Sequence, residues 1–171
     1  MINNNCIAAT TEKKQTITLS CEKENILNIF NSEIDKILSN KYPRGKQIVV
    51  NSKPTDKWLD AGLENVKIVM PVAVFLKATK EKHQVDEDVI RNLPILLQNP
   101  RYIFKSSSDN VSFVGVLDAF EISNSEQKPL IVVIKPVYGK AIVNMISSIY
   151  GKDKDFISRE TNKGNLLYQR K

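Results

Sequence analysis

The one histidine of the chain, His83, has the side chain best suited to acid–base chemistry near neutral pH. It ends the run Lys80-Glu-Lys-His83, so Lys80 and Lys82 stand close to it. A histidine flanked by lysines can act as general acid or base on a phosphodiester, whose negative charge the lysines neutralise. A histidine at the end of a helix can equally be a surface residue that suits the negative end of the helix dipole. The local sequence leaves both interpretations open.

Two more polar groups lie where strands are expected. Lys105 and Ser106 end one strand and begin the run Lys105-Ser-Ser-Ser108, which is either a plain polar turn or part of a binding site. If residues 141–150 form a strand, then Asn144, Ser148 and Tyr150 fall on one face, where they would line a cleft for a phosphate or a base. The core side of that strand would then carry Val143, Met145, Ser147 and Ile149.

Composition excludes several classes of function. The 171 residues contain neither G-x-G-x-x-G nor G-x-x-x-x-G-K-[ST], which argues against Rossmann and P-loop nucleotide binding. One histidine and two cysteines without a C-x-x-C cannot form a histidine- or cysteine-rich metal site, so we expect no metal and no cofactor. The net charge of +6 fits either an anionic partner or a solvated basic surface.

Targeting signals are not evident either. The longest apolar run, 68–76, is too short to span a membrane, and the first residues lack the pattern of a signal peptide. We therefore expect the protein to act in the cytoplasm without a membrane partner.

Hydrophobic spacing predicts helices first and strands later. Apolar residues three and four apart predict a helix over 20–38 that begins at Ser20, after a polar tail over 1–19. Short elements follow: strands over 47–51 and 66–70, and helices over 54–61, 71–79, 87–92 and 93–98. After Pro100 the period changes to two, which predicts strands over 102–106, 111–120 and 130–135.

Residues 141–150 fit either a strand or a helix, and we assign a strand because the segment is rich in β-branched side chains. A helix over 155–162 and a strand over 165–168 complete the chain. This order predicts an α+β fold with an antiparallel sheet over 101–168 and the helices of 54–98 on one face. The predicted division is a helical appendage with its polar tail, 1–45, and a domain over 46–171.

Taken together, these motifs resemble the phage MuF C-terminal domain family, which is placed among the barnase–EndoU–colicin–RelE-like ribonucleases of phage-borne and polymorphic toxins. The resemblance extends from about Ile48 to Tyr168. It rests on short motifs in the same order and at similar spacing: Ser52-Lys-Pro-Thr55, Lys80-Glu-Lys-His83, Leu93-Pro94, Asn99-Pro100, Ile103-Phe-Lys-Ser106, Pro129-Leu-Ile-Val-Val133, Asn144-Met-Ile-Ser-Ser-Ile-Tyr-Gly-Lys152 and Gly164-Asn-Leu-Leu-Tyr168.

The resemblance implies a barnase- or RelE-like fold, in which helices pack on one face of a curved antiparallel sheet and RNA lies on the other. It also implies a metal-independent endoribonuclease toxin, in which a ribose 2′-hydroxyl attacks the adjacent phosphate. His83 matches the family's histidine, Ser148-Ile-Tyr150 matches its Ser/Thr-x-Tyr, and Lys105 and Ser106 match its polar pair. A cognate immunity protein or antitoxin is the implied protein partner.

In this interpretation His83 is the general acid or base, Ser148 binds the scissile phosphate and Tyr150 stacks on a base. The remaining candidates contact RNA or neutralise its phosphates: Lys80, Lys82, Lys105, Ser106, Asn144 and Lys152. Barnase pairs its histidine with a glutamate base. Here Asp118 and Glu121 are available carboxylates, but no motif singles out either one.

Two other functions remain open. A catalytically silent module that binds nucleic acid or protein on the same fold would have no reason to bring His83, Lys105 and Ser148 into one cleft. An NAD-consuming toxin would need an aromatic-lined cavity with a carboxylate aimed at the ribose.

Overall fold

The computed structural model describes the backbone of residues 5–123, 126–136 and 142–171. The elements in chain order are α1 (Asn5–Leu38), β1 (Gln47–Asn51), α2 (Asp56–Asp60), β2 (Ile68–Pro71), α3 (Val72–Leu76), the π-helical turn η1 (Lys77–Glu81), α4 (Glu87–Arg91), α5 (Leu93–Leu96), β3 (Tyr102–Lys105), β4 (Phe113–Ser123), β5 (Glu126–Pro136), β6 (Asn144–Gly151), α6 (Phe156–Asn162) and β7 (Leu166–Gln169).

The strands form one seven-stranded sheet in the order β1-β2-β6-β5-β4-β3-β7. Every neighbouring pair is antiparallel except β2 and β6, which run parallel where Ile68 faces Asn144 and Val69 faces Met145. The α+β class and the antiparallel character predicted for residues 101–168 are confirmed. The sequence did not predict the parallel contact, because it joins segments far apart in the chain.

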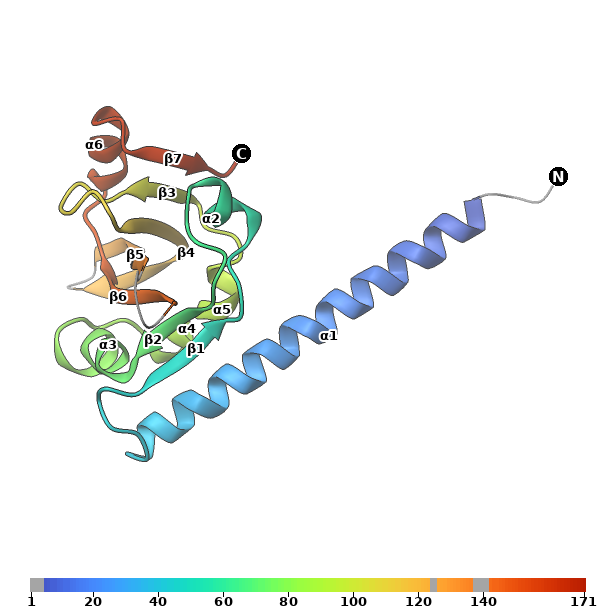
Figure 1. The fold of residues 1–171 in the computed structure, drawn as a ribbon, viewed down its shortest axis with the longest axis horizontal. Coiled ribbons are helices and arrows are strands. Elements are labelled where there is room, and N and C mark those ends of the chain that lie inside the picture. Colours follow the sequence, from blue (N-terminus) through green and yellow to red (C-terminus); the bar gives the residue numbers. More distant parts are fainter. Residues whose placement is uncertain (1–4, 124–125, 137–141) are drawn as a thin grey trace.

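The two faces of the sheet carry different layers (Figure 1). On one face, side chains of α1 to α5 and of the strands form the main hydrophobic core, with Phe30, Trp58, Phe75, Ile90 and Leu93 among its buried members. On the other face, α6 lies near β3 and β7, and its Phe156 joins a smaller cluster of Phe104, Val114, Val116 and Ile131. The helices before Pro100 therefore share one face, and α6 covers part of the other.

Helix α1 is longer than the sequence analysis predicted. It begins at Asn5 and runs through Ser20, so the predicted start of the helix at Ser20 is wrong. No proline or glycine stands between Asn5 and Leu38, and the backbone therefore has no residue that would stop the helix earlier. The C-terminal part of α1 packs on the core through Phe30, Ile34 and Ile37, whereas the N-terminal part extends away from the sheet (Figure 1). Among the described residues, no helix is long and apolar enough to cross a membrane.

Strand β6 contains a bulge that decides which side chains reach each face. Val133 faces Ser148 and Ile134 faces Ile146, so Ser147 has no partner on β5. The strand assignment of this segment is confirmed, although Ala141 lies outside the described residues. Because of the bulge, Ile146 and Ile149 both reach the main core.

The predicted faces of β6 are therefore partly wrong. Asn144 does not share a face with Ser148 and Tyr150: it is fully buried, and its side-chain amide donates to the carbonyls of Glu64 and Val66 over 2.8 and 3.1 Å. Met145 and Ser147, expected on the core side, are only half-buried. The predicted turn after β4 is also shorter than expected, because β5 already begins at Glu126.

Candidate active site

A tight turn places His83 beside the part of β6 that follows its pairing with β2. Strand β2 ends at Pro71, whose fixed φ suits the start of a helix, and α3 and η1 then run past the second half of β6. In η1 the carbonyl of Lys77 accepts the N–H groups of both Lys82 and His83, over 3.0 and 3.1 Å. Such π-helical turns are frequent at functional sites. The turn brings the imidazole to the face of Tyr150.

The rings of His83 and Tyr150 are stacked. Their centroids lie 5.2 Å apart and their planes differ by 20°. His83, Ser148 and Lys77 also line a narrow crevice. The crevice has about 10 Å³ of free space, which is enough for about one water molecule. The Ser148 hydroxyl donates to the carbonyl of Ser147 over 2.7 Å, so its proton is engaged in this structure.

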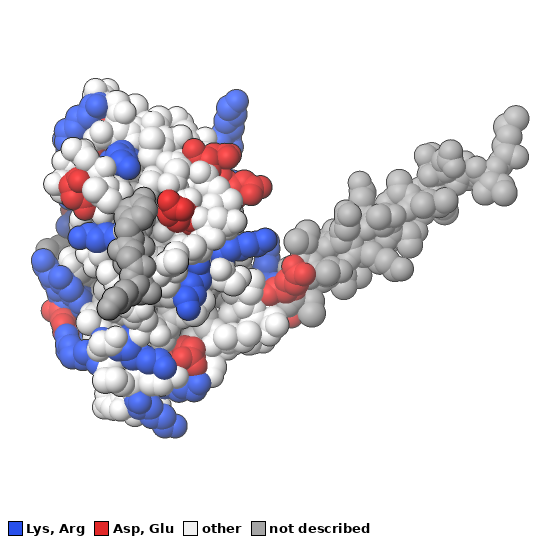
Figure 2. Space-filling model, viewed as in Figure 1, with Lys and Arg blue, Asp and Glu red and all other residues white. Residues whose placement is uncertain are grey.

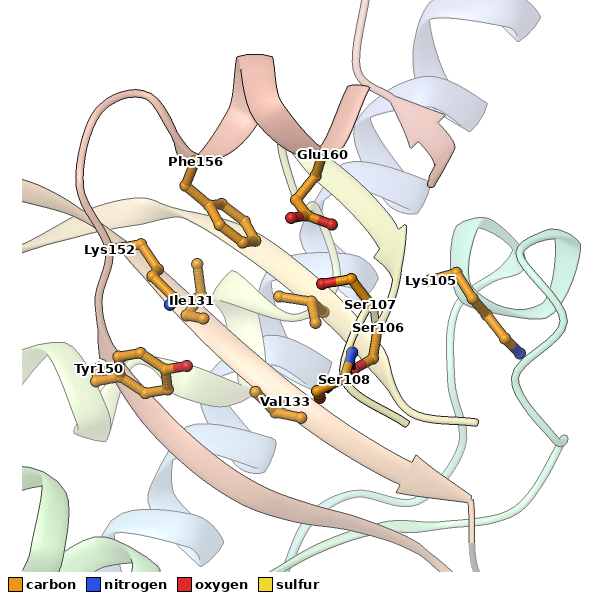
Figure 3. Close-up of a pocket in the computed structure, with 11 residues that line it drawn as sticks. Lys105, Ser106, Ser107, Ser108, Ile131, Val133, Tyr150, Lys152, Phe156 and Glu160 are labelled. Carbon is orange, nitrogen blue, oxygen red and sulfur yellow. Dashed lines mark hydrogen bonds between the residues drawn. The ribbon is translucent and has the colours of Figure 1, made fainter. Parts of the chain in front are cut away.

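A larger cavity is lined in part by Tyr150. It has a volume of about 170 Å³ and lies between β4, β5, β6, α6 and the loop that follows β3 (Figure 3). Its floor is apolar and its rim is polar; the lining residues are Lys105, Ser106, Ser107, Ser108, Val114, Ile131, Val133, Tyr150, Lys152, Phe156 and Glu160. An apolar floor with a few polar groups is the usual make-up of a small-molecule or base-binding pocket.

Lys152 supplies the positive charge nearest to the aromatic groups of this cavity. Its ammonium lies 5.5 Å from the ring centroid of Tyr150 and 5.7 Å from that of Phe156. Lys105 behaves differently, because its side chain runs away from the other lining residues and its ammonium sits 4.7 Å from the ring centroid of Phe113 (Figure 3). Of these two predicted phosphate-binding lysines, only Lys152 has its charge beside Tyr150.

Ser106 helps to shape the loop that borders the cavity. It is 5% exposed, its hydroxyl shares a 2.9 Å hydrogen bond with that of Ser108, and it accepts the backbone N–H of Ser108 over 3.3 Å. Lys80 lies away from the cavity and faces Glu87 at 3.7 Å, whereas Lys82 is exposed next to His83. Asn144 is held inside the fold, apart from both the crevice and the cavity.

The pKa of His83 lies below its ordinary value. Partial burial lowers it most, the charge of Glu121 opposes that effect, and Lys82 and Lys77 lower it further. Because the ordinary value is 6.5, the imidazole is mostly uncharged at pH 7. A neutral imidazole can accept a proton, so His83 is in the form that a general base needs.

Two carboxylates at or near the site were not singled out by any motif. Glu121 is 7% exposed, accepts the backbone N–H of Gly151, and its charge acts on His83. Glu160, 5% exposed, lines the cavity and accepts hydrogen bonds from Lys163 and Asn165. Burial alone would raise the pKa of Glu160, but these hydrogen bonds outweigh it and the pKa is lowered. The one feature of the sequence that could have pointed to Glu121 and Glu160 is that each is an acidic residue within or beside an apolar stretch of a strand or helix.

Asp118, which together with Glu121 was a candidate for the missing base, lies elsewhere. It forms an ion pair with Arg170 over 3.0 Å and borders a different hollow between β4 and α4. It therefore takes no part in the arrangement around His83.

The chain carries charges of both signs with a net charge of +6. Figure 2 shows lysine and arginine side chains, with acidic ones among them, over the part of the surface where Figure 1 places α3. A surface of this kind attracts polyanions over a range set by the salt concentration.

Comparison with known families agrees with the resemblance seen in the motifs. A family model described as the phage MuF C-terminal domain matches residues 70–171. The match includes the motifs from Lys80 onward and leaves Ser52-Lys-Pro-Thr55 outside it. The comparisons with curated proteins and with solved structures returned no match.

Proposed function

Because the chain belongs to the phage MuF C-terminal domain family, we propose that it is a metal-independent endoribonuclease of a phage or polymorphic toxin system. The observation that carries this proposal is the stacked pair of His83 and Tyr150 at the border of a cavity that also holds Lys152. These groups support the proposal because a base can remove the 2′-hydroxyl proton, an aromatic ring can stack on an RNA base and a cation can neutralise phosphate charge.

Each group has a separate task in this proposal. Lys152 neutralises phosphate charge, and the rings of Tyr150 and Phe156 offer a platform for a base of the RNA. Stacking of a base on an aromatic side chain contributes about 1–3 kcal/mol, which supports modest rather than strict base preference. Ser148 lies beside His83 and can turn its hydroxyl from the Ser147 carbonyl to a phosphate oxygen.

The reaction is an internal transfer of the phosphate. His83 takes the proton of the ribose 2′-hydroxyl, the 2′-oxygen forms a bond to phosphorus, and the bond from phosphorus to the 5′-oxygen breaks. The leaving 5′-oxygen takes a proton from water, and the imidazolium returns its proton to the hydroxide that remains. The products are a 2′,3′-cyclic phosphate and a 5′-hydroxyl end.

A protein partner follows from the same proposal. A toxin that cleaves RNA needs an immunity protein or antitoxin in the cell that makes it, and an acidic face on that partner would suit the basic surface of this chain.

A silent RNA-binding module is the second candidate, because Lys105 turns its charge away and the Ser148 proton is engaged within the chain. It would bind RNA through the same surface and leave it intact. The experiment below separates the two functions.

The test is cleavage of a labelled RNA by the purified protein and by His83→Ala, with Gln84→Ala as the matched control at an exposed neighbour. We expect His83→Ala to lower the rate by roughly 10²–10⁴-fold, the usual contribution of a positioned base, and Gln84→Ala to have no effect. EDTA should change nothing. Cleavage that continues where the ribose is 2′-deoxy would exclude attack by the 2′-hydroxyl, and binding without any cleavage would favour the silent module.

A further inference from the structure

Strands β4 and β6 are joined by a contact that the sheet itself does not supply. Strand β5 lies between them, yet the carboxylate of Glu121 on β4 accepts the backbone N–H of Gly151 at the end of β6. The approach is close enough that a Cβ on Gly151 would lie 2.7 Å from the Cβ atoms of Glu121 and Lys128. The missing side chain of Gly151 is therefore what lets the carboxylate reach this backbone.

The residue held in this way stands between two cavity residues. Gly151 separates Tyr150, whose ring stacks on His83, from Lys152, whose ammonium lies near the rings of Tyr150 and Phe156. One residue beyond Gly151, the N–H of Lys152 donates to the carbonyl of Pro129 on β5 over 3.0 Å. The hydrogen bond to Glu121 thus fixes the backbone from which both side chains project.

Glu121 is also the acidic group that acts on His83. The charged groups that affect the imidazole are Lys77 of η1, Lys82 of the following turn and Glu121 of β4, while Tyr150 of β6 covers one face of the ring. Lys128 of β5 stands directly opposite Glu121. Lys77 and Lys82 disfavour the charged form of the imidazole, whereas the carboxylate of Glu121 favours it.

We propose that Glu121 is a positioning residue: its carboxylate ties the end of β6 to β4, sets the places of Tyr150 and Lys152, and presents a negative charge to His83. A buried carboxylate engaged with the Gly151 N–H has no need to touch RNA, so the role is exerted through its neighbours. The catalytic consequence rests on the proposed ribonuclease function, whereas the structural consequence does not.

Two substitutions separate the effect of the hydrogen bond to Gly151 from the effect of the negative charge. Glu121→Gln keeps an oxygen that can accept the Gly151 N–H but removes the charge. Glu121→Ala removes both. Glu126→Gln is the matched control, because Glu126 is an exposed glutamate on the neighbouring strand β5.

The first readout is independent of any activity. Because the chain has one histidine, NMR titration of the imidazole reports His83 without ambiguity. We expect Glu121→Gln to lower its pKa by a few tenths of a pH unit, the order of a Coulomb effect at partly exposed sites, and Glu126→Gln to leave it unchanged. Hydrogen exchange of the Gly151 amide should stay slow in Glu121→Gln and become faster in Glu121→Ala.

The second readout is RNA cleavage. Glu121→Gln should move the acidic limb of the rate profile to lower pH with little loss at the plateau, whereas Glu121→Ala should lose on the order of 10- to 100-fold, because small displacements of catalytic groups have effects of that size. A wild-type His83 titration in Glu121→Gln, or wild-type exchange of the Gly151 amide in Glu121→Ala, would overturn the proposal. If both change as expected but no protein, the unmodified one included, cleaves RNA, then the ribonuclease function fails and the positioning role stands.

Discussion

At the scale of single residues, the proposed reaction depends on the charge state of His83. Its ring is stacked on that of Tyr150, and the charges of Lys77, Lys82 and Glu121 act on it. Burial and the lysines favour the neutral imidazole, which is the form that removes a proton. In the proposed function, the positive charges of these two lysines would also favour a phosphate nearby, so they would act on the substrate and on the base together.

The pH dependence of cleavage follows from this charge state. His83 must be neutral to act as the base, and its pKa lies below 6.5, so kcat/KM should be flat at neutral pH and fall as the pH drops through that lowered pKa. A rate profile from about pH 5 to 8 measures it. A rate that instead falls as the pH rises through this range would mean that the charged imidazole is the active form.

Ser148 should contribute less than His83. Its hydroxyl lies in the same crevice but transfers no proton in the proposed reaction, so Ser148→Ala removes at most one hydrogen bond to phosphate. We expect a loss of roughly 10-fold in kcat/KM, since hydrogen bonds to charged groups contribute about 1.5–3 kcal/mol at most and this one must first leave the Ser147 carbonyl. Ser158→Ala, at an exposed serine of α6, is the control. A loss as large as that of His83→Ala would give Ser148 a direct role in the chemistry.

At the scale of elements, the bulge in β6 explains where sequence reasoning succeeded and where it did not. Alternation of side chains located the strand and placed Ser148 and Tyr150 together, because both follow the bulge. It failed for Asn144, because Ser147 has no partner on β5 and the parity of the strand changes there. A bulge depends on the pairing partner, and its position is not encoded in the strand's own pattern. For the same reason no motif pointed to Glu121, whose partner Gly151 lies two strands away.

The close contact at the end of β6 gives a stability prediction. In Gly151→Ala the new Cβ would meet the Cβ atoms of Glu121 and Lys128 at 2.7 Å, so the strand end must move. We expect the free energy of unfolding to fall by about 1–3 kcal/mol, as for other overpacked sites. Gly45→Ala is the control, because a Cβ there would meet nothing within 4 Å. Equal stability of the two variants in urea unfolding would show that β6 ends in open space.

At the scale of the whole molecule, the helix expected to be an appendage contributes to the main core. Phe30, Ile34 and Ile37 of α1 are buried against the layer that also contains Trp58 and Leu93. Arg91 of α4 adds an ion pair with Asp35 of α1 over 2.8 Å. The last turns of α1 therefore belong to the structure that supports the sheet.

Two isoleucines of α1 test this contribution in matched form. Ile34 is fully buried and Ile29 is 62% exposed. Ile34→Ala should lower the free energy of unfolding by about 2–5 kcal/mol, as large-to-small changes in cores do. Ile29→Ala should change it by no more than about 0.5 kcal/mol. Similar values for the two variants would place α1 outside the cooperative unit.

The whole-molecule charge makes a prediction about RNA binding. Each lysine that contacts a phosphate releases bound counterions, and on single strands each contact adds about −0.7 to the slope of log K against log salt. Three or four contacts would give a slope on the order of −2 to −3. Binding measured with the His83→Ala protein, which leaves the RNA intact, should show this slope. Lys152→Ala should reduce its magnitude by roughly 0.7, whereas Lys105→Ala should leave it unchanged, because the Lys105 ammonium sits on the Phe113 ring and not over the cavity. An affinity that does not respond to salt would mean that the basic surface binds no nucleic acid.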